Sequence, residues 1–391
     1  MSFQNTSWEA SENQINLVNL IAGNAHKSPE QQDKVMGIFA GEGVGPEITQ
    51  AAIKVLDAIE VVYSLNIKRS YGEAIGLSGG ENGHDAEGKI TQKAVDFCEK
   101  IFSQSGAIMC GPGGGRFVYD LRRRFDLFCK IVPLRPSAEL HSVNRVKPDY
   151  LHNLDIVIVR DNAGGVYQGC WSENKDSADG CVAEQRFSYT QTQVERIINV
   201  AVRLSLTRKG RLHVIVKEGG VPGISRLWQQ VARRVCSETQ VRCIVLNADN
   251  AAYQLIQHPV EFDVIVTPNM VGDILADLGA VLLGSRGLSY SANYSAKGNA
   301  VYQTGHGAAF DLTGTDRANP AAQILSMAMM LRESFNCHVE ASCIEQAIED
   351  VWHAGWRTPD ITQNGDRIVG TQRMGELIAE AVLTQVGNRV H

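Results

Sequence analysis

Short apolar runs alternate along the chain with stretches of helical periodicity. The runs are rich in Val, Ile and Leu, and they predict buried strands at residues 35–40, 107–110, 155–160, 212–216, 243–246 and 262–266. Apolar side chains at helical spacing predict helices over residues 48–59 and 194–206, from about residue 269, and over residues 321–331 and 375–386. Strands that alternate with helices throughout predict an α/β fold.

Two of the predicted strands run into glycine-rich turns. The first turn reads GEGVGPE at residues 41–47, and the second reads GPGGG at residues 111–115. The first is only superficially like a dinucleotide-binding fingerprint, because its third glycine comes too early and a proline follows it. Taken alone, it predicts a tight turn from a strand into a helix.

The length of the chain bounds its organisation. A chain of 391 residues is too long for one small core and fits two domains. No linker rich in Pro or Ser separates the halves, so we expect the two domains to share a continuous sheet or to intertwine. Residues 1–33 are rich in Asn, Gln, Ser and Glu, which predicts an N-terminal extension that is at most partly ordered.

Composition and charge narrow the range of partners. The hydrophobic fraction of 44% and the charged fraction of 20% are ordinary for a globular protein. A net charge of -6 gives no reason to expect nucleic acid or an anionic membrane surface as a partner. No apolar run approaches the roughly 20 residues that span a bilayer. Nine cysteines without a CxxC pair or a regular spacing indicate reduced thiols and a cytoplasmic location.

A pair of carboxylates at the start of a predicted helix is a candidate metal site. Asp273 and Asp277 are four residues apart, so both lie on one face of the helix and repel each other unless a cation lies between them. Carboxylate oxygens suit Mg²⁺ or Mn²⁺. The alternative is an acidic pair that only interacts favourably with the helix dipole. Asp249 follows a predicted strand and is a third candidate ligand.

Six stretches in a fixed order are similar to the isopropylmalate and isocitrate dehydrogenase family. They read GEGVGPE, LRRRFDLF, IVRDNAGGVYQG, NADNAA, NMVGDILAD and GHGAAFDLTGTDRANP, and the resemblance spans roughly residues 34–390. It implies an isopropylmalate dehydrogenase-like fold, with two interlocked domains and a mixed sheet flanked by helices. The implied divisions are an N-terminal extension (1–33), a cofactor-side domain (34–130 plus 285–391) and a dimerisation and metal-side domain (131–284).

The resemblance also implies roles for polar residues. Asp249, Asp273 and Asp277 match the carboxylates that bind the divalent metal, one of which comes from the other subunit of an obligate homodimer in the family. Tyr167 matches the tyrosine that acts as an acid late in the reaction.

Two arginines, Arg122 and Arg160, match the residues that hold the carboxylates of a small carboxylic acid substrate. A guanidinium group is well suited to bind a carboxylate through two hydrogen bonds.

The stretch at residues 305–320 matches the family's cofactor segment. By resemblance, His306, Gly307 and Ala308 line the adenine site, and Asn319 belongs to the same site. An acidic residue at the position of Asp311 accepts hydrogen bonds from the ribose hydroxyls and repels a 2′-phosphate. The lysine and tyrosine of the family's NADP users are absent at position 311 and the next, so the resemblance implies NAD.

One departure from the family falls on the general base. Where the family has an Asp-Lys pair, this chain reads Lys217-Glu218, so that Glu218 takes the position of the lysine. A one-residue shift along a strand turns a side chain to the opposite face, so Lys217 does not automatically replace it. Gly220 also replaces an asparagine of the family. Either Lys217 or Glu218 therefore remains a candidate for the catalytic base.

A second departure falls on substrate binding. Val132 stands where the family has a third carboxylate-binding arginine, and Arg135 lies three residues further on as a candidate substitute. The segment at residues 115–121 is shorter than in the malate-type enzymes, and it places residues 118–120, including Tyr119, where those enzymes read the side group of the substrate.

Because the departures fall on the chemistry and not on the metal or cofactor motifs, we expect a changed substrate or reaction. The leading hypothesis is an NAD-dependent oxidoreductase that uses Mg²⁺ or Mn²⁺ and acts on the CH–OH group of a malate-like 2-hydroxy acid, with or without the family's decarboxylation step. The alternative is a catalytically weak homologue that serves as a ligand-binding or regulatory subunit. Turnover, as opposed to binding alone, distinguishes the two.

Overall fold

The computed structural model describes residues 16–23, 33–78 and 87–387. The remaining residues of the predicted N-terminal extension, 1–15 and 24–32, lie outside this description.

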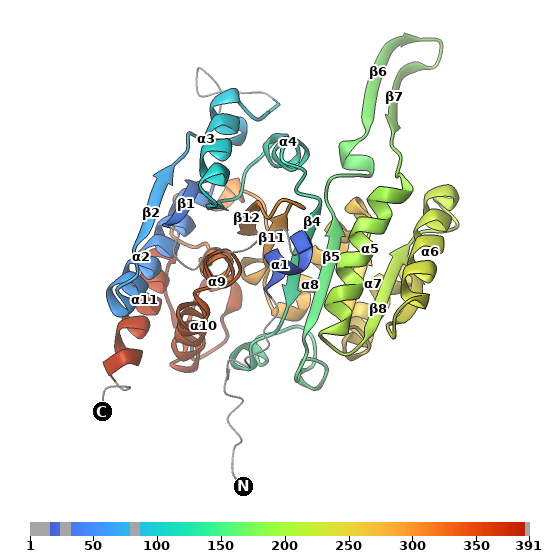
Figure 1. The fold of residues 1–391 in the computed structure, drawn as a ribbon. Coiled ribbons are helices and arrows are strands. Elements are labelled where there is room, and N and C mark those ends of the chain that lie inside the picture. Colours follow the sequence, from blue (N-terminus) through green and yellow to red (C-terminus); the bar gives the residue numbers. More distant parts are fainter. Residues whose placement is uncertain (1–15, 24–32, 79–86, 388–391) are drawn as a thin grey trace.

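A mixed sheet of ten strands forms the centre of the molecule (Figure 1). Its order is β2-β1-β3-β12-β11-β4-β5-β10-β8-β9. The strands are β1 (Lys34–Phe39), β2 (Ile67–Tyr71), β3 (Ala107–Cys110), β4 (Cys129–Leu134), β5 (Ile156–Asp161), β8 (Arg211–Val216), β9 (Arg242–Asn247), β10 (Val264–Thr267), β11 (Tyr290–Tyr294) and β12 (Ala300–Thr304). Strands β2, β1, β3 and β12 are parallel, and so are β5, β10, β8 and β9. The antiparallel pairs β12–β11, β11–β4 and β4–β5 join these two halves.

This sheet confirms the predicted α/β class and the predicted continuity between the halves. The six predicted strands correspond to β1, β3, β5, β8, β9 and β10. The joining strands β4, β11 and β12 were not predicted, because polar residues interrupt their apolar pattern. Lys130 and Pro133 interrupt β4, and Ser291 and Asn293 interrupt β11, although Lys130, Ser291 and Asn293 are buried.

Helices cover the sheet on both faces. They are α1 (Leu17–Ala22), α2 (Gly45–Tyr63), α3 (Gln92–Ser103), α4 (Phe117–Arg124), α5 (Gln191–Leu206), α6 (Pro222–Ser237), α7 (Ala248–Gln257), α8 (Asn269–Leu283), α9 (Ala321–Phe335), α10 (His338–His353) and α11 (Thr371–Gly387). The five predicted helices correspond to α2, α5, α8, α9 and α11. In Figure 1, α5 lies in front of β5 and α8 lies behind it, and both helices contact that strand. Among the described residues, no helix is both long and apolar enough to cross a membrane.

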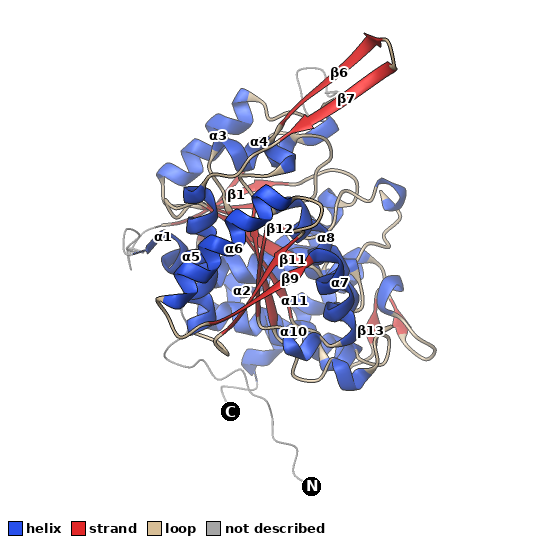
Figure 2. Ribbon diagram, turned by 90° about the vertical axis from the view of Figure 1, so that its right-hand side faces the viewer, coloured by secondary structure: helices blue, strands red, loops and turns tan. Residues whose placement is uncertain are grey.

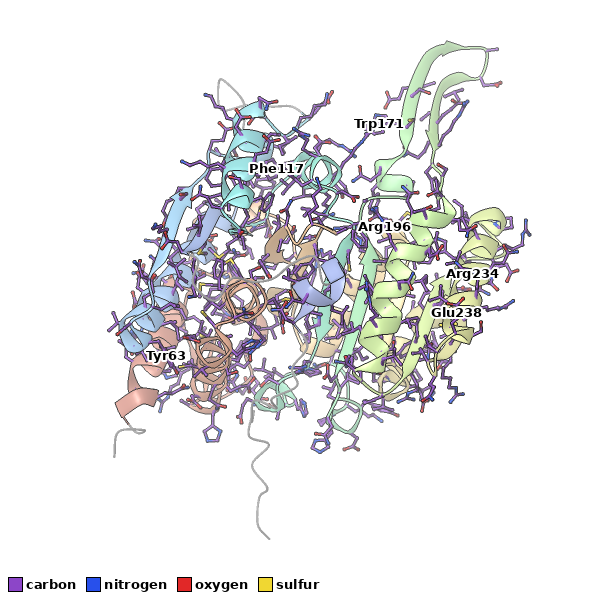
Figure 3. All side chains as sticks on the ribbon, viewed as in Figure 1. Tyr63, Phe117, Trp171, Arg196, Arg234 and Glu238 are labelled. Carbon is purple, nitrogen blue, oxygen red and sulfur yellow. The ribbon has the colours of Figure 1, made fainter. Side chains whose placement is uncertain are left out.

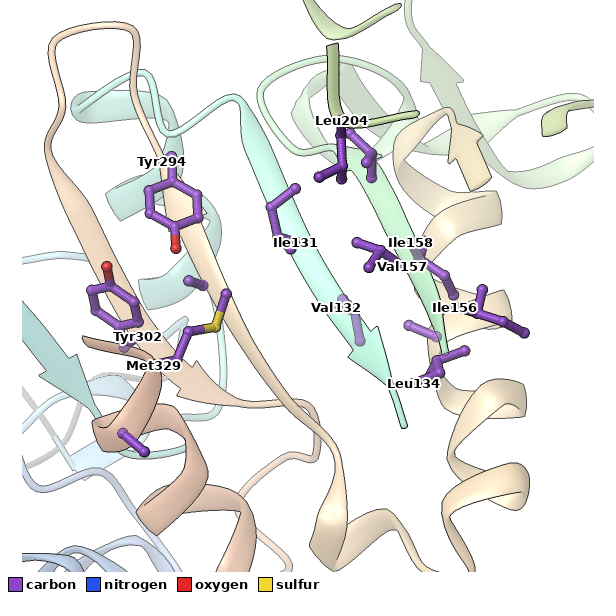
Figure 4. Close-up of a cluster of buried hydrophobic side chains, with 14 of the residues drawn as sticks. Ile131, Val132, Leu134, Ile156, Val157, Ile158, Leu204, Tyr294, Tyr302 and Met329 are labelled. Atoms are coloured by element: carbon purple, nitrogen blue, oxygen red, sulfur yellow. The ribbon is translucent and has the colours of Figure 1, made fainter. Parts of the chain in front are cut away.

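One apolar core extends across the junction between the halves (Figure 4). It includes Ile131 and Val132 of β4, Ile158 of β5, and the rings of Tyr294 and Tyr302 on β11 and β12. All five of these residues are buried. The central strands are therefore held from both sides by apolar packing, which fixes the positions of the polar side chains at their ends.

Part of the N-terminal extension is ordered and packed. Helix α1 lies between α5 and α9, which belong to opposite halves of the sheet (Figure 1). Its side chains Val18, Leu20 and Ile21 are buried in the main core. The side chain of Asn16 caps the helix by accepting a hydrogen bond from the backbone N–H of Asn19 at 3.0 Å. This segment therefore connects the two halves.

Two small two-stranded sheets, one antiparallel and one parallel, complete the fold. Strands β6 (Cys170–Ser177) and β7 (Gly180–Arg186) form an antiparallel hairpin that projects from the body of the molecule (Figure 2). The side chains of β7 are exposed along its whole length. Strands β13 (Trp356–Arg357) and β14 (Arg367–Ile368) form a short parallel pair. The hairpin, called the arm below, exposes residues on both of its strands and is a candidate contact surface.

Candidate active site

A row of buried polar side chains crosses the centre of the sheet. Lys130 of β4 is the direct cross-strand partner of Arg160 on β5, and it also pairs with Asn293 on β11. Arg160 pairs in turn with Thr267 on β10. Directly paired residues of adjacent strands project from the same face of a sheet. The row therefore places the charges of Lys130 and Arg160 close together on one face, in spite of their burial.

Arg160 is fixed in a tight network. Its side chain is only 1% exposed. Its Nε and Nη2 donate to Oδ1 of Asn269 at 3.1 and 2.7 Å, and its Nη1 donates to Oδ1 of Asp273 at 2.5 Å. Asn269, at the start of α8, is anchored in turn by donating to the backbone carbonyl of Gly164. The orientation of the guanidinium is therefore set by the junction between β10 and α8.

Tyr167 shares Asp273 with Arg160. The hydroxyl of Tyr167 donates to Oδ2 of Asp273 at 3.0 Å. Burial, followed by the charge of Asp273, raises the pKa of Tyr167 to about 12. Burial is the largest single effect on the pKa of Asp273 and raises it, but the charges of Arg160, Lys130 and Arg122 and the hydrogen bond from Tyr167 together outweigh burial, so the pKa is lowered. The structure thus brings together three residues that the sequence predicted for this site, with a protonated phenol beside a carboxylate.

Arg122 adds a second buried guanidinium, from the last turn of α4. It is 5% exposed, and its Nε has no hydrogen-bond partner. Within the described residues it makes no ion pair, and its guanidinium lies over the ring of Tyr119, with its central carbon 5.6 Å from the ring centre. Burial, followed by the like charge of Arg160, lowers the pKa of Arg122 to about 10. Tyr119 also packs edge-on against Tyr167, with ring centres 5.5 Å apart.

Lys130 is a site residue that the sequence analysis missed. It is 4% exposed, and burial, followed by the charges of Arg122 and Arg160, lowers its pKa well below the ordinary value. The sequence CKIVPL of β4 does not predict a strand, so it gives no sign that position 130 lies in the sheet. The register of an antiparallel pair depends on long-range contacts, so the signal that places Lys130 beside Arg160 is not present in the local sequence.

A cavity of about 820 Å³ opens beside this cluster. Tyr167, Arg116 and Trp171 contribute to its lining. The guanidinium of Arg116 lies between two rings, with its central carbon 5.0 Å from the ring centre of Tyr119 and 4.8 Å from that of Trp171. Trp171 reaches toward α4 from the base of the arm (Figure 3). The cavity therefore meets the cluster at Tyr167, and its lining combines aromatic and cationic groups with the carboxylate of Glu87.

The three predicted metal carboxylates are not assembled within one chain. Asp273 and Asp277 lie on α8, where Asp277 forms an ion pair with Arg286 at 2.8 Å. Asp249, at the start of α7, instead pairs with Lys217 at 2.9 Å. Among the described residues, no group of three side chains is arranged to hold a metal ion. Carboxylate oxygens, which suit Mg²⁺ or Mn²⁺, are present on Asp273 and Asp277 of α8, but Asp249 does not join them within one chain.

The two candidates for the catalytic base also lie apart from the cluster. Lys217 and Glu218 follow β8 and are exposed. Glu218 Oε2 accepts a hydrogen bond from Gln229 at 3.0 Å, while Lys217 pairs with Asp249. Throughout the described part of the chain, no hydrogen bond or ion pair links either residue to Arg160. Both side chains face solvent in the single chain.

Arg135 occupies a different place from the one predicted for it. It follows the last residue of β4 and pairs with Asp155 at 3.1 Å. Because Lys130 lies near the start of β4 and opposite Arg160, Arg135 lies at the other end of the strand from the cluster. Its guanidinium therefore does not join Arg122 and Arg160.

The predicted cofactor segment folds against the first glycine-rich turn. The backbone N–H of Val44 donates to the carbonyl of Ala308 at 2.9 Å. A Cβ atom at Gly43 would lie 2.0 Å from that same carbonyl, and Gly43 has a positive φ of 58°. Only glycine permits this approach. The turn GEGVGPE and the segment at residues 306–312 thus form one surface at the amino end of α2.

The predicted cofactor residues are distributed over this surface. Nδ1 of His306 lies 2.9 Å from the carbonyl of Gly307, and burial lowers the pKa of His306. Asp311 is exposed, while Asn319 is buried and donates to Asp360 at 3.2 Å. Gly307 is exposed, with open space where a Cβ would lie. A carboxylate is therefore displayed on an open, glycine-rich surface.

Comparisons with known proteins agree with this architecture. The family model for isocitrate/isopropylmalate dehydrogenase matches residues 35–378. The 3-isopropylmalate dehydrogenase of Priestia megaterium is 34% identical over 363 residues, which cover 89% of this chain and 96% of the relative. That of Geobacillus kaustophilus is 35% identical over 362 residues, with coverages of 89% and 95%. The crystal structure of isocitrate dehydrogenase from Methylococcus capsulatus superposes with a TM-score of 0.78 at 28% identity and covers 90% of this chain and all of that one.

Proposed function

The chain belongs to the isocitrate/isopropylmalate dehydrogenase family, and from this premise we propose that it oxidises the CH–OH group of a malate-like 2-hydroxy acid. NAD is the proposed hydride acceptor, and Mg²⁺ or Mn²⁺ is the proposed metal. The family relationship suggests that loss of CO₂ follows the oxidation, and this chain has Glu218 at the position of the base that takes the hydroxyl proton.

One observation carries the proposal. Three buried cationic side chains, those of Arg122, Lys130 and Arg160, lie together, and among the described residues only Asp273 forms a direct ion pair with one of them. Buried charges without counter-charges are strongly unfavourable, by several kcal/mol each. Such an excess of positive charge beside an open cavity is suited to a small acid with more than one carboxylate, which supplies the missing negative charges.

The proton donor is also part of the cluster. Because its pKa is raised to about 12, Tyr167 keeps its proton near neutral pH. Its hydroxyl is oriented by Asp273, and the Arg160 guanidinium lies 5.8 Å from the ring centre of Tyr167. The phenol is therefore held where it can return a proton from its oxygen to an acid bound by Arg122 and Arg160.

The carboxylates of α8 fit a hard divalent cation in kind. Asp273 and Asp277 present oxygen donors on one helix face, each with a side chain that is more than 40% exposed. A bound Mg²⁺ or Mn²⁺ polarises the hydroxyl and stabilises negative charge on its oxygen. A third carboxylate is needed, and Asp249 is available for this on a different surface.

We propose that Asp249 and Lys217 act in the site of a second copy of the chain. Both are exposed beside α8, whose surface carries Met270, Ile274 and Val281 in one apolar stripe, exposed to 43%, 58% and 39%. An apolar stripe on a helix surface favours association with another protein surface. The exposed arm supplies a second contact surface. In a homodimer in which Asp249 of each chain reaches the site of the other, the set of three metal-binding carboxylates would be complete.

The proposed choice of NAD rests on Asp311. Its exposed carboxylate lies on the surface formed by the glycine-rich turn and the segment that begins at His306. A carboxylate accepts hydrogen bonds from ribose hydroxyls and repels a phosphate dianion.

We also retain the division into domains 34–130 plus 285–391 and 131–284, because the two sets of parallel strands fall on either side of it. The cytoplasmic location stays a prediction.

A direct assay tests the function. Malate-like 2-hydroxy acids are incubated with NAD and Mn²⁺, and the reduced cofactor and released CO₂ are measured. We expect reduced cofactor with at least one such acid and none when the metal is chelated. Tight binding of the acids without turnover would instead support the catalytically weak, ligand-binding alternative, which the solvent-facing positions of Lys217 and Glu218 also accommodate.

A further inference from the structure

Lys130 lies in an unusual environment for a lysine, because it is buried next to two arginines. The side chain is buried at 4% exposure, in the sheet row that also contains Arg160. In the described part of the chain, its Nζ forms no hydrogen bond and no ion pair. Its Nζ is not among the fully buried polar atoms, so the stem of the side chain is packed while the ammonium can still be reached by a ligand. A lysine that is buried over most of its length without a counter-charge is rare.

We infer that Lys130 is a specificity-determining residue, whose ammonium binds a second carboxylate of the substrate and so restricts the site to acids with at least two carboxylates. This inference rests on the proposed function for the presence of a hydroxy acid in the site. The role it assigns to Lys130 concerns binding, and can be measured without turnover.

The local charges explain why only an external anion fits. The pKa of Lys130 is lowered by burial and then by the positive charges of Arg122 and Arg160. Two carboxylates of α8, Asp273 and Asp277, act on Lys130 through their charges. Both already have partners, because Asp273 binds Arg160 and the hydroxyl of Tyr167, and Asp277 pairs with Arg286. The protein therefore supplies more buried cations than anions around this point. A dicarboxylate corrects the imbalance, with one group available to the arginines and the other to Lys130.

The strand geometry explains how Lys130 can act where Val132 cannot. Residues two apart on a strand project from the same face, about 6.6 Å apart along the strand. Val132 is apolar and buried, so it offers no charge to a carboxylate. A lysine side chain is long enough to carry its ammonium over such a distance. The cation at position 130 can therefore serve the face on which Val132 lies.

If Lys130 binds a carboxylate, the site distinguishes acids with two carboxylates from acids with one. A 2-hydroxy acid with one carboxylate fills the arginines but leaves the ammonium of Lys130 without a counter-charge. Sites built around a charged or hydrogen-bonding partner discriminate strongly against ligands that lack it. Malate and 2-hydroxybutyrate form a matched pair, because a carboxylate in malate replaces the terminal methyl group of 2-hydroxybutyrate.

Titration calorimetry of the full-length protein with Mn²⁺ tests the inference. We expect the unmodified protein to bind malate at least about tenfold more tightly than 2-hydroxybutyrate. Lys130→Met is expected to weaken malate binding by about 10- to 100-fold while 2-hydroxybutyrate binding changes less than about threefold. Lys130→Arg keeps the charge and is expected to retain most of the discrimination. Lys68→Met, which removes an exposed lysine from strand β2, is the matched control.

Thermal unfolding without ligand separates this role from a structural one. Lys130→Met removes an uncompensated buried charge, so its midpoint is expected to equal or exceed that of the unmodified protein. A midpoint that falls by several degrees, with both acids weakened equally, would overturn the inference. So would the absence of malate binding to the unmodified protein, or normal discrimination in Lys130→Met. If malate binding depends on Lys130 but no reduced cofactor forms, the proposed dehydrogenase function fails and the inference about Lys130 stands.

Discussion

At the scale of single residues, the site is defined by an imbalance of charge. Arg122, Lys130 and Arg160 are buried together, and Asp273 alone forms a direct ion pair with one of them. Folding does not favour this arrangement, since burial lowers the pKa of both Arg122 and Lys130. Strain of this kind is expected where a protein binds a ligand that completes it.

The role of Tyr167 leads to a prediction about chemistry. Tyr167→Phe removes the hydroxyl that donates to Asp273 but keeps the ring that packs against Tyr119. We expect turnover to fall by about 10²- to 10⁴-fold, because a positioned acid contributes that much. Dicarboxylate binding, measured by calorimetry, is expected to change by less than about threefold. An unchanged rate would mean that the proton comes from another group.

Asp311 leads to a prediction about the cofactor. Asp311→Lys replaces a group that repels a 2′-phosphate with one that attracts it. We expect the unmodified protein to bind NAD more tightly than NADP, and the variant to narrow or reverse this preference, as measured by titration calorimetry. Asp366→Asn removes a carboxylate from a separate exposed turn and serves as the control. Tighter binding of NADP to the unmodified protein would contradict the assignment of Asp311.

At the scale of elements, the strands that were predicted and those that were not differ in a physical way. Strands β1, β5 and β10 are continuous apolar runs and were evident from the sequence. Strand β4 contains Lys130 and Pro133, so its pattern does not distinguish it from a loop. Its place between β11 and β5 is set by contacts between residues far apart in sequence. The motifs therefore predicted Arg122, Arg160, Tyr167 and Asp273 as site residues, and the structure places these four close together, whereas Lys130 could be placed beside them only from the strand register.

The same limit applies to the candidates that the structure keeps apart. Resemblance placed Asp249 with Asp273, and Arg135 near the arginines, by motif order alone. The structure places Arg135 with Asp155 and Asp249 with Lys217. Spacing in a sequence does not specify which end of a strand a residue occupies, nor whether a residue acts in its own chain or in a second copy.

Helix α1 gives a prediction about pH. Glu333 on α9 is buried, its Oε2 accepts the backbone N–H of Leu17 at 2.5 Å, and burial raises its pKa from 4.5 to about 7. A carboxyl with a raised pKa in the folded state contributes stability that is full below pH 4.5 and is lost as the pH rises through about 7. We therefore expect the thermal midpoint to fall between pH 5 and pH 8.

A matched pair of variants isolates this effect. Glu333→Gln cannot ionise and keeps an oxygen that accepts from Leu17, so its midpoint is expected to fall less over the same range, by the equivalent of about 2–3 kcal/mol. Glu340→Gln, on the neighbouring helix α10, is expected to follow the unmodified protein. Equal slopes for all three proteins would show that Glu333 does not control the docking of α1.

At the scale of the whole molecule, the chain is a continuous sheet whose two halves meet at the site. The charged row lies on β4, β5 and their neighbours, where the direction of the strands changes. The surface proposed to bind the cofactor belongs to one half, and the carboxylates of α8 belong to the other. A substrate bound between them would contact both halves.

The proposed sharing of a site between two copies predicts complementation. Asp249→Asn and Asp273→Asn are each expected to be nearly inactive alone, because every site lacks one metal ligand. When the two variants are co-expressed, we expect about a quarter of the normal activity, since half of the dimers are mixed and each mixed dimer keeps one intact site. Light scattering verifies that both variants remain dimers. Failure of the mixture to recover activity would place Asp249 outside the partner's site.

The central claim is that this chain is a family enzyme for a malate-like dicarboxylic 2-hydroxy acid with a small side group. The most direct test compares the kcat/KM for malate with that for 3-isopropylmalate, with NAD and Mn²⁺, from the rate of cofactor reduction. Because the guanidinium of Arg116 lies between the rings of Tyr119 and Trp171, a bulky apolar side group at this point is expected to be unfavourable, since it would exclude water from that cation. We predict a preference for malate of at least about tenfold. A higher kcat/KM for 3-isopropylmalate would contradict the account.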